Sequence, residues 1–188
     1  MKFTEGYWCI KKEITPLYAV EYADSRQNGN ELTVYAPGKH ISDRGDCLNV
    51  GMLTIRLTSP MEDVIRVSVS HFDGTVIRGP FARIYGTPPH TVIEETDEEI
   101  RYRSGRTTAV IDKRPNSWGI RFLDGDRELT NTGFRNMAYM TNRETGRCYM
   151  AEQLAIDVDE YIYGLGERYT PFVKNGQSLE MWLSLIHI

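Results

Sequence analysis

The sequence predicts an all-β protein, built as an antiparallel sandwich or barrel, and three observations support this prediction. Short stretches in which apolar and polar residues alternate recur along the chain, as in strands with one buried face. Asn, Gly, Asp and Pro separate these stretches and favour tight turns. Helical spacing of apolar residues is nearly absent, so the crossover helices that a parallel sheet requires are not expected.

The first two predicted strand pairs lie in the amino-terminal third of the chain. Residues 30–36 place Leu32, Val34 and Ala36 on one side, and the Asn28-Gly29 dipeptide before them is a strong tight-turn signal. Residues 53–57 and 64–69 then form the clearest hairpin. Pro60, in the connection between them, is expected to end the first strand of that hairpin.

Two further hairpins are predicted in the middle of the chain. Residues 100–103 and 107–112 flank Ser104-Gly105. Residues 118–123 and 127–130 flank Asp124-Gly125-Asp126. Evenly spaced short strands joined by such turns indicate an antiparallel sheet architecture.

Composition excludes several classes of partner. The 188 residues are 40% hydrophobic and 26% charged, with a formal net charge of -4, which is typical of a folded, water-soluble domain. Acidic and basic residues alternate without forming a basic stripe, so no nucleic-acid partner is expected. No run reaches the roughly 18 apolar residues of a membrane helix, so no membrane partner is expected.

Cysteine and histidine placement predicts neither disulfides nor a metal site. The three cysteines are scattered and odd in number, which favours free thiols in a reducing compartment; they are Cys9, Cys47 and Cys148. Glu5 stands where a signal peptide would have its apolar stretch, and we expect a cytoplasmic protein. The four histidines lack metal-binding spacing, so we expect no metal; they are His40, His71, His90 and His187.

A motif near the carboxyl end resembles glycoside hydrolase family 31. Residues 163–168 read Tyr-Gly-Leu-Gly-Glu-Arg, like that family's signature, and Lys174-Asn175-Gly176-Gln177 follows. Glu180 and Trp182 stand at the spacing seen in bacterial α-xylosidases. Weaker similarity extends back through the chain, at Gly6-Tyr7-Trp8, Val34-Tyr35-Ala36, Ser70-His71-Phe72, Arg103-Ser104-Gly105 and Tyr149-Met150.

The resemblance implies that residues 1–182 form a galactose mutarotase-like β-sandwich, which in the family precedes a catalytic (β/α)8 barrel that is missing here. It implies a parent enzyme that is a retaining α-xylosidase or α-glucosidase. Such an enzyme acts on the ends of α-linked oligosaccharides, needs no cofactor and forms homo-oligomers. Retaining hydrolysis uses two carboxylates, and both family aspartates lie beyond residue 182. We therefore expect no catalytic residue in this chain and no activity from it alone.

The resemblance also assigns roles within the motif. Gln177, Glu180 and Trp182 are expected on a loop next to the substrate. Gly164 and Gly166 suit positions where the backbone turns sharply or lies close against a neighbour. Glu167 and Arg168 are interpreted as a structural ion pair, although the segment could instead support the loop against the mouth of the barrel.

The last six residues depart from the family pattern. The family motif continues with Asn and Asp where this chain has Leu183 and Leu185. One coding of residues 183–188, CTG TCT CTT ATA CAC ATC, matches the transposon-end adaptor of sequencing libraries. We therefore interpret residues 183–188 as a non-native tail, beyond which the natural reading frame continues.

Two alternatives remain open from the sequence alone. His71 with Glu167 could serve as the acid and base of a mutarotase. The chain could also be a free-standing carbohydrate-binding or interaction module whose aromatic side chains stack on sugar rings. The aromatics considered for this are Tyr7, Trp8, Tyr18, Tyr22, Tyr35, Phe72, Phe81, Tyr85, Tyr102, Trp118, Phe122, Phe134, Tyr139 and Tyr149.

Overall fold

The computed structural model describes residues 3–5, 9–71, 86–166 and 169–179. The chain divides into two units, one of residues 15–155 and one that joins residues 1–14 to residues 156–188. The described residues form fourteen strands and one short 3-10 helix, η1 (Arg44–Cys47). No described helix has the length and apolar character needed to span a membrane. The prediction of an all-β fold is confirmed.

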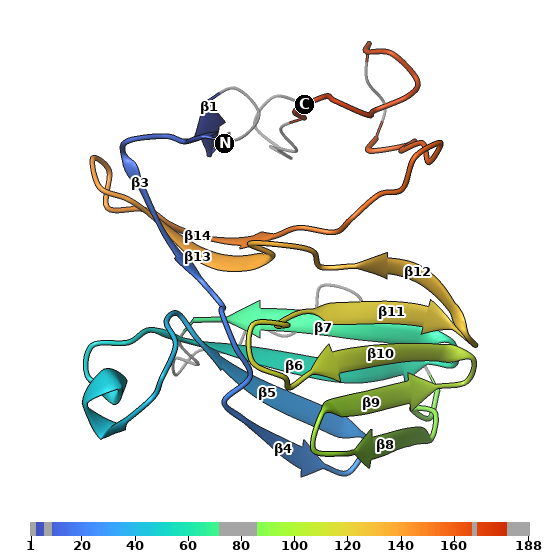
Figure 1. The fold of residues 1–188 in the computed structure, drawn as a ribbon. Helices are drawn as coiled ribbons and strands as arrows, with labels where there is room; N and C mark the ends of the chain where they lie inside the picture. The colour runs from blue at the N-terminus through green and yellow to red at the C-terminus, as the bar shows by residue number, and fades with distance from the viewer. Residues whose placement is uncertain (1–2, 6–8, 72–85, 167–168, 180–188) are drawn as a thin grey trace. The chain divides into compact units, whose positions relative to one another are not determined.

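Two antiparallel sheets form the body of the 15–155 unit (Figure 1). The first has the order β4-β5-β6-β7, and the second has the order β12-β11-β10-β9-β8. Neighbouring strands in each sheet are antiparallel. The strands of the first sheet are β4 (Asp24–Asn28), β5 (Glu31–Pro37), β6 (Met52–Met61) and β7 (Val64–Ser70). Those of the second are β8 (Thr91–Glu95), β9 (Glu99–Ser104), β10 (Thr107–Asp112), β11 (Ile120–Asp124) and β12 (Arg127–Asn131).

The hydrophobic core draws on both of these sheets. Alternate residues of a strand point to the same face, and one face of β5 and of β6 is fully buried while intervening residues are partly exposed. The second sheet contributes apolar residues from β9, β10 and β11 to the same cluster. Its members include Leu32, Val34, Ala36, Leu53, Ile55, Leu57, Ile100, Tyr102, Ala109, Ile111 and Ile120.

A third sheet has the order β14-β13-β3. It is formed by β3 (Ile14–Tyr18), β13 (Met137–Asn142) and β14 (Cys148–Glu152). Met137 of β13 is fully buried in the core, and its carbonyl accepts a hydrogen bond from Ala19 N at 3.0 Å. In the other unit, β1 (Thr4–Glu5) pairs with β2 (Cys9–Ile10).

The predicted hairpins are confirmed at their turns. Asn28 pairs with Glu31 around Gly29, and Ser104 pairs with Thr107 around Gly105. Gly29 and Gly105 have φ values of +57° and +56°, the left-handed region that two-residue hairpin turns require. Pairing of residues 54–58 with β7, and of β11 with β12, is also observed.

Two strand boundaries were predicted wrongly. Pro60 does not end its strand, because β6 continues to Met61 and the chain turns at Glu62-Asp63 instead. The register of β6 with β7 shifts between Thr58 and Met61, and such a bulge accommodates a proline, which has no N–H for the ladder. The strand predicted at residues 118–123 begins only at Ile120, which leaves Trp118 in the preceding loop.

Candidate functional site

The motif near the carboxyl end lies in the 160–177 loop, of which the structure describes residues 160–166 and 169–177. Lys174 N donates a hydrogen bond to Ile162 O at 2.7 Å. The side chain of Asn175 accepts from Ile162 N at 2.7 Å and donates to Glu160 O at 2.9 Å. Among the described residues, these three hydrogen bonds of Lys174 and Asn175 join the two arms of the loop.

The tip of the loop depends on its glycines for conformational reasons. Gly164, Leu165 and Gly166 have φ values of +88°, +65° and +84°, and only glycine adopts this region without steric cost. Among the described residues, a Cβ added at Gly164 or Gly166 would meet no atom within 4 Å. The positive φ values agree with a sharp turn of the backbone at both glycines.

Lys174 is buried at the base of the loop. Its residue is 8% exposed, and its ammonium donates to Thr170 Oγ1 at 2.8 Å and to Pro171 O at 2.6 Å. A buried charge is tolerated when hydrogen bonds replace its hydration. The side chain of Lys174 therefore holds residues 170–171 in place, and its backbone N–H holds residue 162.

The predicted substrate-adjacent residues are only partly described. Gln177 N donates to Lys174 O at 3.0 Å across a turn in which Gly176 has a φ of +74°. The Gln177 side chain folds back and donates from Nε2 to Val173 O at 2.6 Å. Glu167, Arg168, Glu180 and Trp182 lie outside the described residues, so their predicted roles stay predictions. The described part of the motif brings Gly164, Gly166 and Gln177 into one loop.

The same loop carries exposed aromatic side chains. Tyr163 lies 5.0 Å from Phe172 and 6.4 Å from Tyr161, measured between ring centroids. Phe172 is 78% exposed, and Val158 nearby in sequence is 84% exposed. Exposed apolar side chains of this size favour an interaction surface. The alternation Tyr161-Ile162-Tyr163 is a sequence signal that these two tyrosines share a face.

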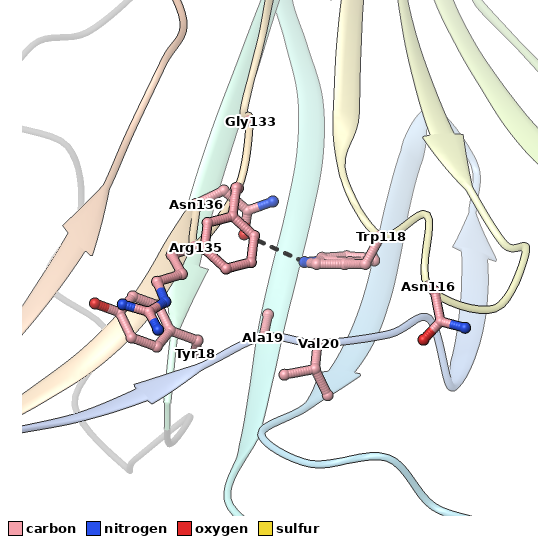
Figure 2. A pocket seen from close by; sticks show the side chains of 9 residues that line it. Tyr18, Ala19, Val20, Asn116, Trp118, Gly133, Arg135 and Asn136 are labelled. Atoms are coloured by element: carbon pink, nitrogen blue, oxygen red, sulfur yellow. Dashed lines mark hydrogen bonds between the residues drawn. The ribbon is translucent and has the colours of Figure 1, made fainter.

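The 15–155 unit contains a separate hollow of about 380 Å³. Tyr18 at the end of β3, the β10–β11 loop with Trp118, and the β12–β13 loop with Phe134 line it. Trp118 Nε1 donates to Asn136 Oδ1 at 3.3 Å, the dashed line in Figure 2. All three aromatic residues are among those considered above for stacking on sugar rings, but only the fold shows that they lie together.

Two further sequence predictions concern His71 with Glu167 and metal binding. His71 stacks on Tyr139 with ring centroids 4.1 Å apart, and its Nδ1 is buried. Glu167, its proposed partner in a mutarotase, is outside the described residues. Within the described residues, no group of three or more His, Cys, Asp and Glu side chains is placed to hold a metal ion.

Most of the chain is similar in sequence to known proteins. The family model of the glycosyl hydrolase 31 N-terminal galactose mutarotase-like domain matches residues 54–184. Alpha-xylosidase XylQ of Lactiplantibacillus pentosus is 41% identical over 182 residues, which are 97% of this chain and 24% of that protein. An alpha-xylosidase of Emericella nidulans is 32% identical over 203 residues, covering 97% of this chain and 26% of that protein.

Other known proteins are similar to this chain in sequence or in fold. Alpha-glucosidase 2 of Bacillus thermoamyloliquefaciens is 28% identical over 71% of this chain and 16% of its own length. The cycloalternan-forming enzyme of Listeria monocytogenes, solved with a pentasaccharide substrate, superimposes with a TM-score of 0.65 at 17% identity. That superposition covers 87% of this chain and 14% of the solved chain. The chain spans about a quarter of the length of the alpha-xylosidases that it matches.

Proposed function

Because the chain belongs to the family of glycosyl hydrolase 31 N-terminal galactose mutarotase-like domains, we propose that it is the amino-terminal part of a retaining α-glycosidase. The observation that carries the proposal is the 41% identity to an alpha-xylosidase over 97% of the chain. The proposed substrates are the ends of α-linked oligosaccharides.

The proposed division of labour follows from what retaining hydrolysis requires. One carboxylate attacks the anomeric carbon and a second protonates the leaving oxygen, and the two must be held about 5–5.5 Å apart. In the proposal both belong to the barrel that follows residue 182 in the parent enzyme. The 188-residue chain contributes a scaffold and the loop of residues 160–177, and by itself it does not hydrolyse glycosides.

Among substrates, the identities favour a xyloside. The two relatives named as alpha-xylosidases are 41% and 32% identical to this chain, and the relative named as an alpha-glucosidase is 28% identical. We therefore propose an α-xylosidase first and an α-glucosidase second. The proposal includes a homo-oligomeric parent. It also places the parent in the cytoplasm, because Cys9, Cys47 and Cys148 are free and exposed, as is usual for thiols in a reducing compartment.

The first experiment is to resequence the source DNA through the codon for Trp182 with long reads that do not depend on transposon-cut fragments. We expect the frame to continue into Asn-x-Asp and then into a barrel with two catalytic aspartates. A genuine stop after Ile188 contradicts the proposal and favours a free-standing module.

The second experiment measures hydrolysis of p-nitrophenyl α-xyloside and α-glucoside by the extended protein. We expect turnover of at least the xyloside, with the 188-residue chain as the inactive control. Proton NMR of the first product distinguishes retention from inversion, and release of the β-anomer contradicts a retaining mechanism.

A further inference from the structure

The hollow beside Trp118 has the features of a small-molecule site. Its volume of about 380 Å³ lies within the range of roughly 300–1,000 Å³ that is usual for such sites. Three aromatic side chains contribute to its walls, and one of them, Phe134, is 80% exposed. An exposed ring at the edge of a hollow gains apolar contact when a ligand covers it.

A buried hydrogen-bond network holds Trp118 in place. Asn136 is 2% exposed, accepts from Trp118 Nε1, and donates from Nδ2 to Thr132 Oγ1 at 2.9 Å. Thr132 Oγ1 in turn accepts from Ile120 N at 3.0 Å, which ties the network to β11. The indole is therefore oriented before any ligand arrives, which reduces the entropy lost on binding.

The loops on the two sides are also held in unusual backbone conformations. Asn116 has a φ of +64°, and Gly133 and Arg135, which flank Phe134, have φ values of +66° and +55°. A non-glycine residue in this region is strained and persists only where its surroundings fix it. The Arg135 guanidinium carbon lies 5.7 Å from the Tyr18 ring centroid and 5.1 Å from that of Phe134. Figure 2 shows Arg135 beside Tyr18, with Asn116 on the other side of Trp118.

The chemistry of the lining selects a class of ligand. Among the described residues that line the hollow, Arg135 is the one with a formal charge, so a multiply charged ligand is disfavoured. Aromatic faces accept the apolar C–H face of a pyranose ring, and amide and guanidinium groups hydrogen-bond with hydroxyls. We propose that this hollow binds a pyranose unit of an oligosaccharide.

A second hollow extends the site to more than one sugar unit. It has a volume of about 360 Å³ and shares Asn116, Trp118, Gly133 and Phe134 with the first. Asp112 and Arg121 also line it and add one acidic and one basic group. The two hollows together match a ligand of at least two linked rings, with Trp118 and Phe134 contacting both.

The test titrates the 188-residue chain with isomaltotriose and follows the indole N–H resonances by ¹H–¹⁵N NMR. The chain has three tryptophans, and Trp118→Phe assigns the resonance of interest. We expect that resonance to shift with isomaltotriose and not with sorbitol, which has hydroxyls but no ring face. The choice of an α-glucan probe rests on the proposed function; the aromatic and amide chemistry does not.

Two substitutions locate the binding. Phe134→Ala removes an exposed ring, and we expect it to weaken binding about fivefold, as loss of one aromatic contact predicts. Asn116→Gly removes the amide while keeping the positive φ, and we also expect weaker binding. Leu48→Ala is the matched control, since Leu48 is 72% exposed and does not line either hollow.

Two results overturn the proposal. One is a Trp118 resonance that does not move in the folded chain at tens of millimolar isomaltotriose. The other is binding that Phe134→Ala and Asn116→Gly leave unchanged. Where the chain self-associates, the same titration on the ¹⁵N-tryptophan-labelled extended protein gives the same two readouts. Hydrolysis by the extended protein is measured separately, so a failure of the proposed function and a failure of this inference are distinguishable.

Discussion

The side chain of Asn175 joins the two arms of the 160–177 loop. Asn175→Ala removes the hydrogen bonds to Ile162 N at 2.7 Å and to Glu160 O at 2.9 Å. A typical hydrogen bond contributes about 0.5–1.5 kcal/mol net. Asn175 is exposed, so water can replace part of each bond, and we expect a local loss of about 1–2 kcal/mol.

Native-state hydrogen exchange measures this loss at the amide that Asn175 protects. A loss of 1.4 kcal/mol corresponds to a factor of about 10 in exchange rate, since RT is about 0.59 kcal/mol. We expect the Ile162 amide to exchange about 5–30 times faster in Asn175→Ala. Core amides of the 15–155 unit, such as that of Ile55, should exchange at unchanged rates.

A conservative substitution separates the two bonds. Asn175→Asp keeps the acceptor oxygen for Ile162 N and loses the donor to Glu160 O. We expect it to retain most of the protection at Ile162. Equal protection of Ile162 in the wild-type chain and in Asn175→Ala would refute the reasoning, because it would show that the side chain does not close the loop.

Three further predictions concern stability and association. Gly105→Ala should lower the unfolding free energy measured by urea titration more than Gly29→Ala does. Both glycines have φ near +57°, but of the two only Gly105 is placed so that an added Cβ would overlap Asp63 Oδ1, the acceptor for Arg106 N. Equal losses of unfolding free energy would contradict this reasoning. Hydrogen bonds from Arg114 hold the pKa of Asp112 below its usual value. The pair therefore stabilises the fold at a pH above the unfolded-state pKa of Asp112, and this contribution is lost as the pH falls through the folded-state pKa. Asp112→Asn should therefore lower Tm by about 1–4 °C at pH 7, and this difference should shrink as the pH falls below 3.8, the usual pKa of the carboxyl group; a pH-independent difference would argue against this origin. Exposed Phe172 and Val158 should make the isolated chain self-associate in sedimentation velocity, less so with both replaced by Ser, whereas a clean monomer contradicts the prediction.

The hairpins could be predicted from sequence because their information is local. Gly29 and Gly105 sit at turns whose strands follow directly in sequence, so the alternating pattern and the turn residue agree. The third sheet could not be predicted in this way. Its pairing of β3 with β13 joins segments near residues 16 and 139, and no turn signal connects segments that far apart.

In the candidate sites, too, local motifs could be predicted from the sequence and contacts between distant residues could not. The 160–177 loop was found because its motif resembles a family signature, but the motif does not show what its residues do. Asn175 closes the loop on Glu160 and Ile162, 15 and 13 positions away, a contact that no periodicity predicts. Trp118 and Phe134 were noticed as aromatic residues, and only the fold places them in one hollow with Tyr18.

The construction of the 160–177 loop bears on its proposed role. Its shape depends on contacts within the loop: Lys174 and Asn175 join the arms, and the ammonium of Lys174 bonds to Thr170 and Pro171. A loop stabilised in this way leaves its aromatic side chains, Tyr163 and Phe172 among them, available at the surface. Such an arrangement suits a loop that is preorganised to meet another part of the parent enzyme, because the ordering cost is met before the contact forms. Asn175→Ala in the extended enzyme should then raise KM or lower kcat while global stability stays constant. Such a change in kinetics would be attributed to loss of the preorganised loop.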